Sequence, residues 1–79
     1  MTSEKPDATL DTLGFLCPVP IIKAAKRMKA MQVGQILEIL SDDAGIEEDM
    51  PAWCRSHGQG YLGLEKEETM YRVLVKKLK

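Results

Sequence analysis

The chain has 79 residues, of which 44% are hydrophobic and 29% are charged, and its formal net charge is −1. This size allows one globular domain, and the small net charge gives no global reason to expect nucleic acid or an anionic membrane as a partner. No apolar run approaches the roughly 20 residues of a membrane span, and we expect no signal peptide. Two cysteines without an export signal, Cys17 and Cys54, indicate reduced cytoplasmic thiols rather than a disulfide scaffold.

The first residues predict a tail and then a strand. Residues 1–7 are polar and aperiodic, so we expect a flexible N-terminal tail, followed by a single domain over residues 8–79. Residues 8–13 alternate apolar and polar side chains, which is typical of a short strand, and Gly14 ends it. The expected inner face of this strand comprises Ala8, Leu10 and Thr12, with Leu13 closing it.

A helix and a second strand are predicted next. The helix is expected over residues 18–31, because apolar side chains recur there at spacings of three and four, and Gly34 then provides a turn. Its apolar face is expected to hold Ile21, Ile22, Ala25, Met28 and Met31. Residues 36–40 predict a strand with Leu37 and Ile39 on its apolar face. Strand, helix and strand in this order are typical of a right-handed unit with parallel strands.

The second half of the chain predicts another helix and a hairpin. Asp49 is the expected N-cap of the helix, since Pro51 then falls in the first turn, and Gly58 ends it. Met50, Trp53, Cys54 and His57 are expected to share one face of this helix. Residues 61–67 and 69–77 predict a hairpin. Its facing residues are expected to be Leu62 and Leu64 on one strand and Tyr71, Val73 and Val75 on the other.

The order of these elements, βαβαββ, predicts the fold class. Elements in this order form an α/β two-layer sandwich, with two helices on one face of a four-stranded mixed sheet. Open sheets of this kind place their functional sites beyond the carboxyl ends of the parallel strands. Cys17 and the acidic residues 42–49 are both expected at that edge.

Cys17 is the candidate functional residue, because it stands where the first helix begins. With Cys17 as the N-cap, Pro18 and Pro20 occupy the first and third helical positions, where proline is tolerated. Pro20 has no N–H to donate to a cap, so the Val19 amide is expected to point at the sulfur. The amides and the helix dipole favour an anion there. We therefore expect a reactive, partly exposed thiolate at Cys17; a buried, inert cysteine is the alternative.

Residues 17–20 read Cys-Pro-Val-Pro, and several companions surround this motif in order. They are Leu10, Asp11 and Gly14 before it and residues 34–37, 41–43 and 49–54 after it. With them, the sequence resembles the TusA/SirA-like sulfur-carrier family over about residues 9–77. It departs from the family at Ala44, where proline is frequent, and at Met50, where isoleucine is commoner.

The resemblance implies a sulfur carrier of the sulfurtransferase type, a persulfide carrier rather than an enzyme that turns over small substrates. Cys17 would accept sulfane sulfur as a persulfide from a donor protein, such as a cysteine desulfurase or a rhodanese-like protein. It would then pass the sulfur to an acceptor protein. The family serves several pathways, among them tRNA thiolation, cofactor synthesis and sulfur oxidation, and the sequence does not choose between them. We expect a cytoplasmic monomer with no cofactor and no metal, and no direct contact with membrane or nucleic acid.

Other interpretations of Cys54 and His57 remain open. Together with Cys17 they could supply three ligands to zinc or iron, although metal sites usually offer four at short spacings. A disulfide between Cys17 and Cys54 would need closely spaced Cα atoms, whereas we expect Cys54 in the core. His57 is expected at a helix end, and Trp53 in or beside the core.

The charged segments and the fold also admit alternatives. The basic residues of the first helix form either a solvated face or a surface for an acidic partner. The five carboxylates of residues 42–49 have the same two interpretations, or could bind Mg²⁺ or Ca²⁺. The alternative to a sulfur carrier is a non-catalytic protein- or RNA-binding module of the same fold. An RNA-binding surface would combine a basic stripe with exposed aromatic side chains.

Overall fold

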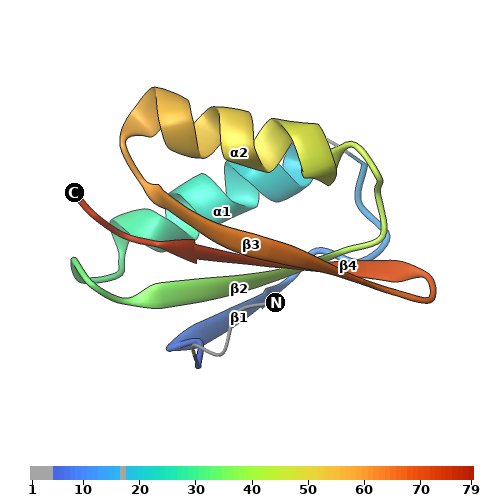
Figure 1. Ribbon diagram of the computed structural model, residues 1–79, viewed down its shortest axis with the longest axis horizontal. Coiled ribbons are helices and arrows are strands. Elements are labelled where there is room, and N and C mark those ends of the chain that lie inside the picture. Colours follow the sequence, from blue (N-terminus) through green and yellow to red (C-terminus); the bar gives the residue numbers. More distant parts are fainter. Residues whose placement is uncertain (1–4, 17) are drawn as a thin grey trace.

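Four strands and two helices follow one another in the predicted order in the computed structural model, which describes residues 5–16 and 18–79. The elements are β1 (Ala8–Asp11), α1 (Val19–Lys29), β2 (Ile36–Ser41), α2 (Ile46–His57), β3 (Gly60–Glu67) and β4 (Met70–Lys76). The strands form one sheet in the order β1-β2-β4-β3. β1 is parallel to β2, and the other two pairings are antiparallel. Both helices cover the same face of the sheet (Figure 1), which confirms the predicted two-layer α/β sandwich.

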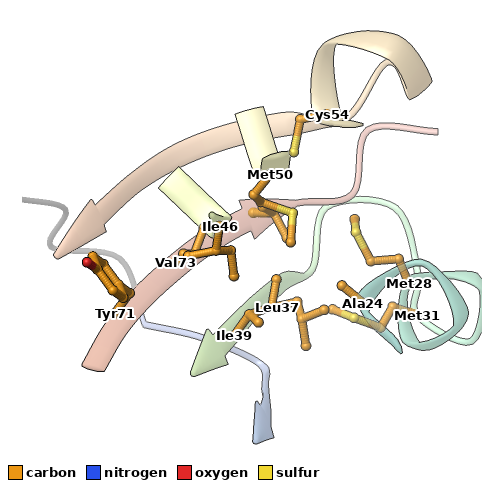
Figure 2. Packing of buried hydrophobic residues seen from close by; sticks show 11 residues of the cluster. Ala24, Met28, Met31, Leu37, Ile39, Ile46, Met50, Cys54, Tyr71 and Val73 are labelled. Carbon is orange, nitrogen blue, oxygen red and sulfur yellow. The ribbon is translucent and has the colours of Figure 1, made fainter. Parts of the chain in front are cut away.

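The core lies between this face and the helices (Figure 2). Every second residue of the central strands points into it, because successive side chains of a strand alternate between the two faces. Leu37 and Ile39 of β2 are fully buried, as predicted. The other members of the cluster are Ala24, Met28, Met31, Ile46, Met50, Cys54, Tyr71, Val73 and Val75.

The buried face of α1 differs from the predicted one. Ala24 is buried at the position expected for Ala25, and Ile22 is 52% exposed. Ala24 and Met28 are four residues apart and therefore lie on the same side of the helix, whereas Ile22 lies well around it. The prediction for Ile22 was wrong, and this side chain is left at the surface.

The predicted start of α2 was also wrong. The helix begins at Ile46, with Gly45 rather than Asp49 in the N-cap position. The Asp43 side chain accepts the Gly45 N–H at 2.9 Å, and this local turn starts the helix earlier. Pro51 consequently lies inside the helix. The earlier start places Ile46 one turn before Met50, so both reach the core.

The hairpin contains a bulge that the sequence did not predict. The register shifts between Tyr61 and Gly63, so that Tyr61 lies opposite Val75 and Leu64 opposite Val73. Leu62 was expected opposite these valines but is the extra residue of the bulge. Leu64 packs against the core as predicted.

The residues before β1 extend its pairing with β2. Asp7 continues the pairing of β1, because its N–H donates to the Ile36 carbonyl and its carboxylate accepts the Ile36 N–H. The predicted tail, residues 1–7, falls partly outside the described residues, and the domain limits stay a prediction. Within the described residues, no helix is long and apolar enough to cross a bilayer.

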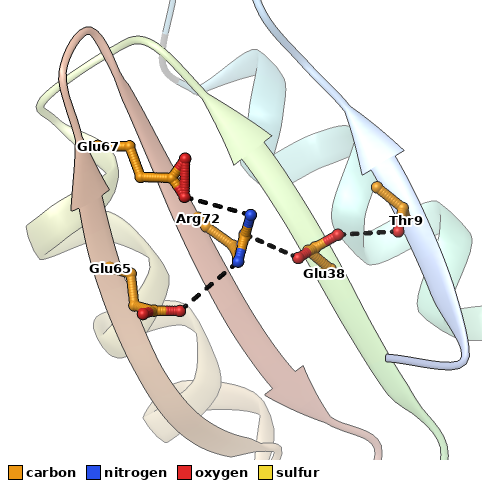
Figure 3. A network of polar contacts seen from close by, with 5 residues as sticks. All are labelled: Thr9, Glu38, Glu65, Glu67 and Arg72. Carbon is orange, nitrogen blue, oxygen red and sulfur yellow. Dashed lines mark hydrogen bonds and ion pairs between the residues drawn. The ribbon is translucent and has the colours of Figure 1, made fainter. Parts of the chain in front are cut away.

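The outer face of the sheet, away from the helices, carries a network centred on Arg72 (Figure 3). The guanidinium lies 2.9 Å from Glu38 on β2, and 3.7 and 3.2 Å from Glu65 and Glu67 on β3. Thr9 of β1 donates to the same Glu38 carboxylate at 2.9 Å. Polar contacts therefore join all four strands on this face.

Candidate functional site around residue 17

The candidate site lies at the loop that joins β1 to α1. Cys17, the predicted site residue, lies outside the described residues, and the segments on both sides of it place the site in the fold. β1 ends at Asp11 and α1 begins at Val19, at the carboxyl edge of the two parallel strands. This is the edge at which sites occur in open α/β sheets.

The start of the loop is fastened to the end of β2. Thr12 is fully buried, and both its N–H and its hydroxyl donate to the Leu40 carbonyl. Two residues on, the Gly14 N–H lies 3.1 Å from each carboxylate oxygen of Asp42. A hydrogen bond to a charged acceptor is stronger than a neutral one. Asp42, from the acidic segment, therefore anchors the loop that leads to residue 17.

Local turns shape the rest of the loop. The Asp11 carboxylate accepts the Leu13 N–H at 2.9 Å, and the Phe15 N–H donates to the Thr12 carbonyl at 3.2 Å. Gly14 has a φ of +87°, a conformation that a residue with a Cβ rarely adopts. The chain thus reverses direction tightly just before the motif.

The helix begins one residue later than expected. Pro18, not Cys17, occupies the N-cap position, so Pro20 is the second helical residue. The Val19 N–H donates to the Leu16 carbonyl at 2.9 Å. The prediction that this amide points at the sulfur was therefore wrong. The positive end of the α1 dipole remains next to residue 17 in the chain, while the Val19 amide is already satisfied.

Large apolar side chains are exposed on both sides of the motif. Leu16 is 73% exposed, and Leu13, Phe15 and Ile22 are exposed as well; we call these four residues the apolar flank. Lys23 places its Nζ 4.9 Å from the centroid of the Phe15 ring, a cation–π contact. Large apolar side chains exposed beside a site are candidates for contact with a partner protein. This feature was not predicted from the sequence, although three large apolar residues within the short loop 12–16 were a signal for it.

The other acidic residues of the segment 42–49 lie in the turn before α2 and in the first turn of this helix. Ser41 Oγ accepts the Asp43 N–H at 3.1 Å, within the turn before α2. Glu47, Glu48 and Asp49 lie in the first turn of that helix, where the helix dipole favours negative charge. In the described part of the chain, no three His, Cys, Asp or Glu side chains are grouped to hold a metal ion.

Cys54 lies in a very different environment from a surface thiol. It is 1% exposed, in the core beneath α2, as predicted. Burial raises the pKa of its thiol from 9.0 to about 11, because desolvation disfavours the thiolate. It is a free cysteine. Cys54 is therefore poorly suited to nucleophilic chemistry.

His57 and Trp53 form a pair at the far end of α2. Their rings stack with centroids 4.6 Å apart, and His57 Nδ1 lies 3.0 Å from the Trp53 carbonyl oxygen. His57 is exposed, while Trp53 is partly buried beside the core, in agreement with the prediction. Both belong to the opposite end of the helix from its acidic first turn.

The fold and the sequence together define the class of protein. The family model described as sulfurtransferase TusA matches residues 8–77, and the chain belongs to this family. Among solved structures, a SirA-like protein from Desulfitobacterium hafniense superposes with a TM-score of 0.78 at 25% identity. That match covers 91% of this chain and 99% of the other.

Three curated relatives are also similar to this chain in sequence. A protein of Bacillus subtilis named "Putative sulfur carrier protein YrkF" is 42% identical over 73 residues, and one of Aquifex aeolicus is 36% identical over 77. The matches cover 92% and 98% of this chain, but the chain spans only 40% and 39% of those two relatives. A relative from Archaeoglobus fulgidus is 37% identical over 70 residues, with 89% of this chain and 96% of that protein covered. The chain thus belongs to the TusA family, and these three relatives are named putative sulfur carrier proteins.

Proposed function

We propose that this protein relays sulfur as a persulfide on Cys17, between a donor protein and an acceptor protein in the cytoplasm. The observation that carries the proposal is the loop of residues 12–16, held by Asp42 at the carboxyl edge of the parallel strands and leading directly to this cysteine. Membership of the TusA family supports a sulfur-carrier role. The buried Cys54 leaves Cys17 as the thiol for the chemistry.

The loading step is an exchange between thiols. The Cys17 thiolate attacks the outer sulfur of a donor persulfide, R–S–SH, and a bond forms between these two sulfurs. The S–S bond of the donor breaks, its electron pair leaves with the donor thiolate, R–S⁻, and the proton stays on the transferred sulfur. Delivery to the acceptor repeats the exchange in the other direction. No outside oxidant or reductant is needed, because the sulfane sulfur carries its oxidation state with it.

The surroundings described above suit such an exchange between proteins. The α1 dipole favours the thiolate and the persulfide anion over their neutral forms. Two thiols on different proteins must come into contact, so the surface beside the site has to fit a partner. The exposed side chains of Leu16 and Ile22 offer apolar area for that contact. The proposed donor is a cysteine desulfurase or a rhodanese-like protein.

A transfer experiment tests this relay. Protein loaded with sulfur-35 persulfide is purified and incubated with a lysate of its source, and labelled acceptors are separated and identified by mass spectrometry. The wild type should pass the label to a discrete acceptor, and Cys17→Ser should pass none. Equal transfer by Cys17→Ser, or label scattered over all exposed thiols, would contradict the relay. The acceptor's identity also distinguishes tRNA thiolation from cofactor synthesis and sulfur oxidation.

A further inference from the structure

The molecule has a groove at the end opposite the candidate site. It lies where α1 and α2 both finish, beside residues 77–79, and its volume is about 370 Å³. Figure 1 shows the C-terminus at this end of the two helices. α1 has 11 residues and is therefore about 16 Å long, which separates the groove from the loop before residue 17.

Basic and apolar side chains both line the groove. Lys29, Lys77, Lys79 and His57 line it, together with the apolar side chains of Met28 and Trp53. No acidic side chain is among the described residues that line it. Neither Lys29 nor Lys79 pairs with a carboxylate in the described part of the chain, where the ion pairs belong to Arg72.

The walls of the groove are held in place by hydrogen bonds. Lys77 Nζ donates to the carbonyls of Met28 and Met31, at 2.7 Å each, and so satisfies the C-terminal end of α1. Gln59 Oε1 accepts the N–H groups of Leu78 and Lys79 at 2.7 and 3.3 Å. The groove is therefore preformed, and the amines of Lys29 and Lys79 remain available to a ligand.

The charged residues of the helix turns are divided between the two ends of the helices. The first turn of α2 carries Glu47, Glu48 and Asp49, whereas the last turns of the helices carry the bases Lys26, Arg27, Lys29, Arg55 and His57. A net charge near zero therefore conceals a basic end, and this end contains the groove. Complementary charge speeds and orients the encounter of two proteins.

We propose that this groove binds an acidic peptide segment of a partner protein, with carboxylates at Lys29 and Lys79 and an apolar side chain beside Met28 and Trp53. An extended peptide fits an open groove with a charged rim, and alternating acidic and apolar residues would satisfy both of its surfaces. Because the groove lies at the other end of α1 from the loop of residues 12–16, a docked partner leaves that loop free. The binding itself does not depend on the proposed sulfur relay.

Trp53 provides the readout, because it is the single tryptophan of the chain and lines the groove. The probe is a tryptophan-free octapeptide of glutamates interrupted by two leucines, and the control peptide has glutamine in place of each glutamate. Titration should change the Trp53 emission saturably with the acidic peptide and much less with the control peptide. Raising the salt from about 0.05 to 0.3 M should weaken the binding, as expected for exposed charges.

Two charge-matched variants locate the site. The double variant Lys29→Glu and Lys79→Glu should raise the Kd at least about tenfold, since repulsion replaces attraction at both rim positions. The control double variant, Lys23→Glu and Lys66→Glu, changes the net charge equally outside the groove and should bind like the wild type. Circular dichroism checks that both variants fold.

Three results would overturn the proposal: equal weakening in both double variants, equal binding of the glutamine peptide, or tighter binding of a uridine octanucleotide that depends on the same lysines. Persulfide loading of Cys17 by a small-molecule donor is measured on the same samples. Loading should be unchanged in the groove variant, so failure of the groove and failure of the sulfur relay are distinguishable.

Discussion

The Asp42 carboxylate at the end of β2 receives the Gly14 N–H on both of its oxygens, each 3.1 Å away, and so fixes the loop that precedes residue 17. We expect Asp42→Ala to lower the free energy of unfolding by about 1 kcal/mol, the typical net contribution of an intramolecular hydrogen bond. Sulfur loading of Cys17 should slow as well. Urea unfolding and a loading time course measure the two effects. Glu68→Ala, in the β3–β4 turn, is the control; if it behaves the same, Asp42 does not hold the loop.

Ile22 is predicted to contact the partner rather than the core. Because its side chain is 52% exposed, Ile22→Ser should change the midpoint of urea unfolding very little. Loading from a small persulfide should also be unaffected, whereas transfer to the acceptor protein should weaken severalfold through lost apolar contact. Val33→Ser, 65% exposed in the α1–β2 turn, is the matched control. Equal transfer by the two variants would remove the apolar flank from the docking surface.

The buried Cys54 should make the free energy of unfolding decrease as the pH rises above about 9. Its thiol ionises near pH 9 in the unfolded chain, but burial raises the pKa to about 11 in the folded protein. Between these values the folded state holds the proton that the unfolded state has lost, so stability decreases as the pH rises, by at most about 2–3 kcal/mol. Urea unfolding from pH 8 to 11 should give a flatter profile for Cys54→Ala. Parallel profiles for variant and wild type would contradict this assignment.

Arg72 is predicted to stabilise the outer face of the sheet. Its removal leaves Glu38, Glu65 and Glu67 close together without a cation. Arg72→Ala should therefore lower the free energy of unfolding by about 1–2 kcal/mol, more than a single exposed ion pair contributes, and high salt should reduce the loss. Arg55→Ala, on the surface of α2, serves as the comparison in the same urea titrations. Losses that match at low and high salt would mean that attraction between these charges is not what stabilises this face.

The sequence was sufficient for the order of the elements and for the central core. Alternation in residues 36–40 identified Leu37 and Ile39, since a buried strand repeats every two residues. The predicted start of α2 was wrong because the Asp43 side chain accepts the Gly45 N–H, and the helix begins after this turn rather than at Asp49. The Tyr61–Gly63 bulge was not predicted, although an isolated glycine within a strand pattern, here Gly63, often marks a bulge.

At the candidate site, the turn and helix-start patterns of the sequence correctly predicted where the loop lies, but they did not predict its hydrogen bonds. The cap geometry assumed that the helix begins directly after residue 17. In the structure the Leu16 carbonyl accepts the Val19 N–H, and Asp42 anchors Gly14 from 28 residues away. A contact of that sequence separation requires the fold to be known. The dipole of α1 is the remaining local reason for a reactive thiol at Cys17, and it favours a pKa below that of a free cysteine.

The most direct test of the account is the mass of the protein after brief incubation with a small persulfide donor. The wild type and Cys54→Ala should each gain the mass of one sulfur atom, which peptide mapping should place on Cys17, and Cys17→Ser should gain nothing. Equal sulfur on both cysteines of the wild type, or no gain at all, would contradict a persulfide carried by Cys17.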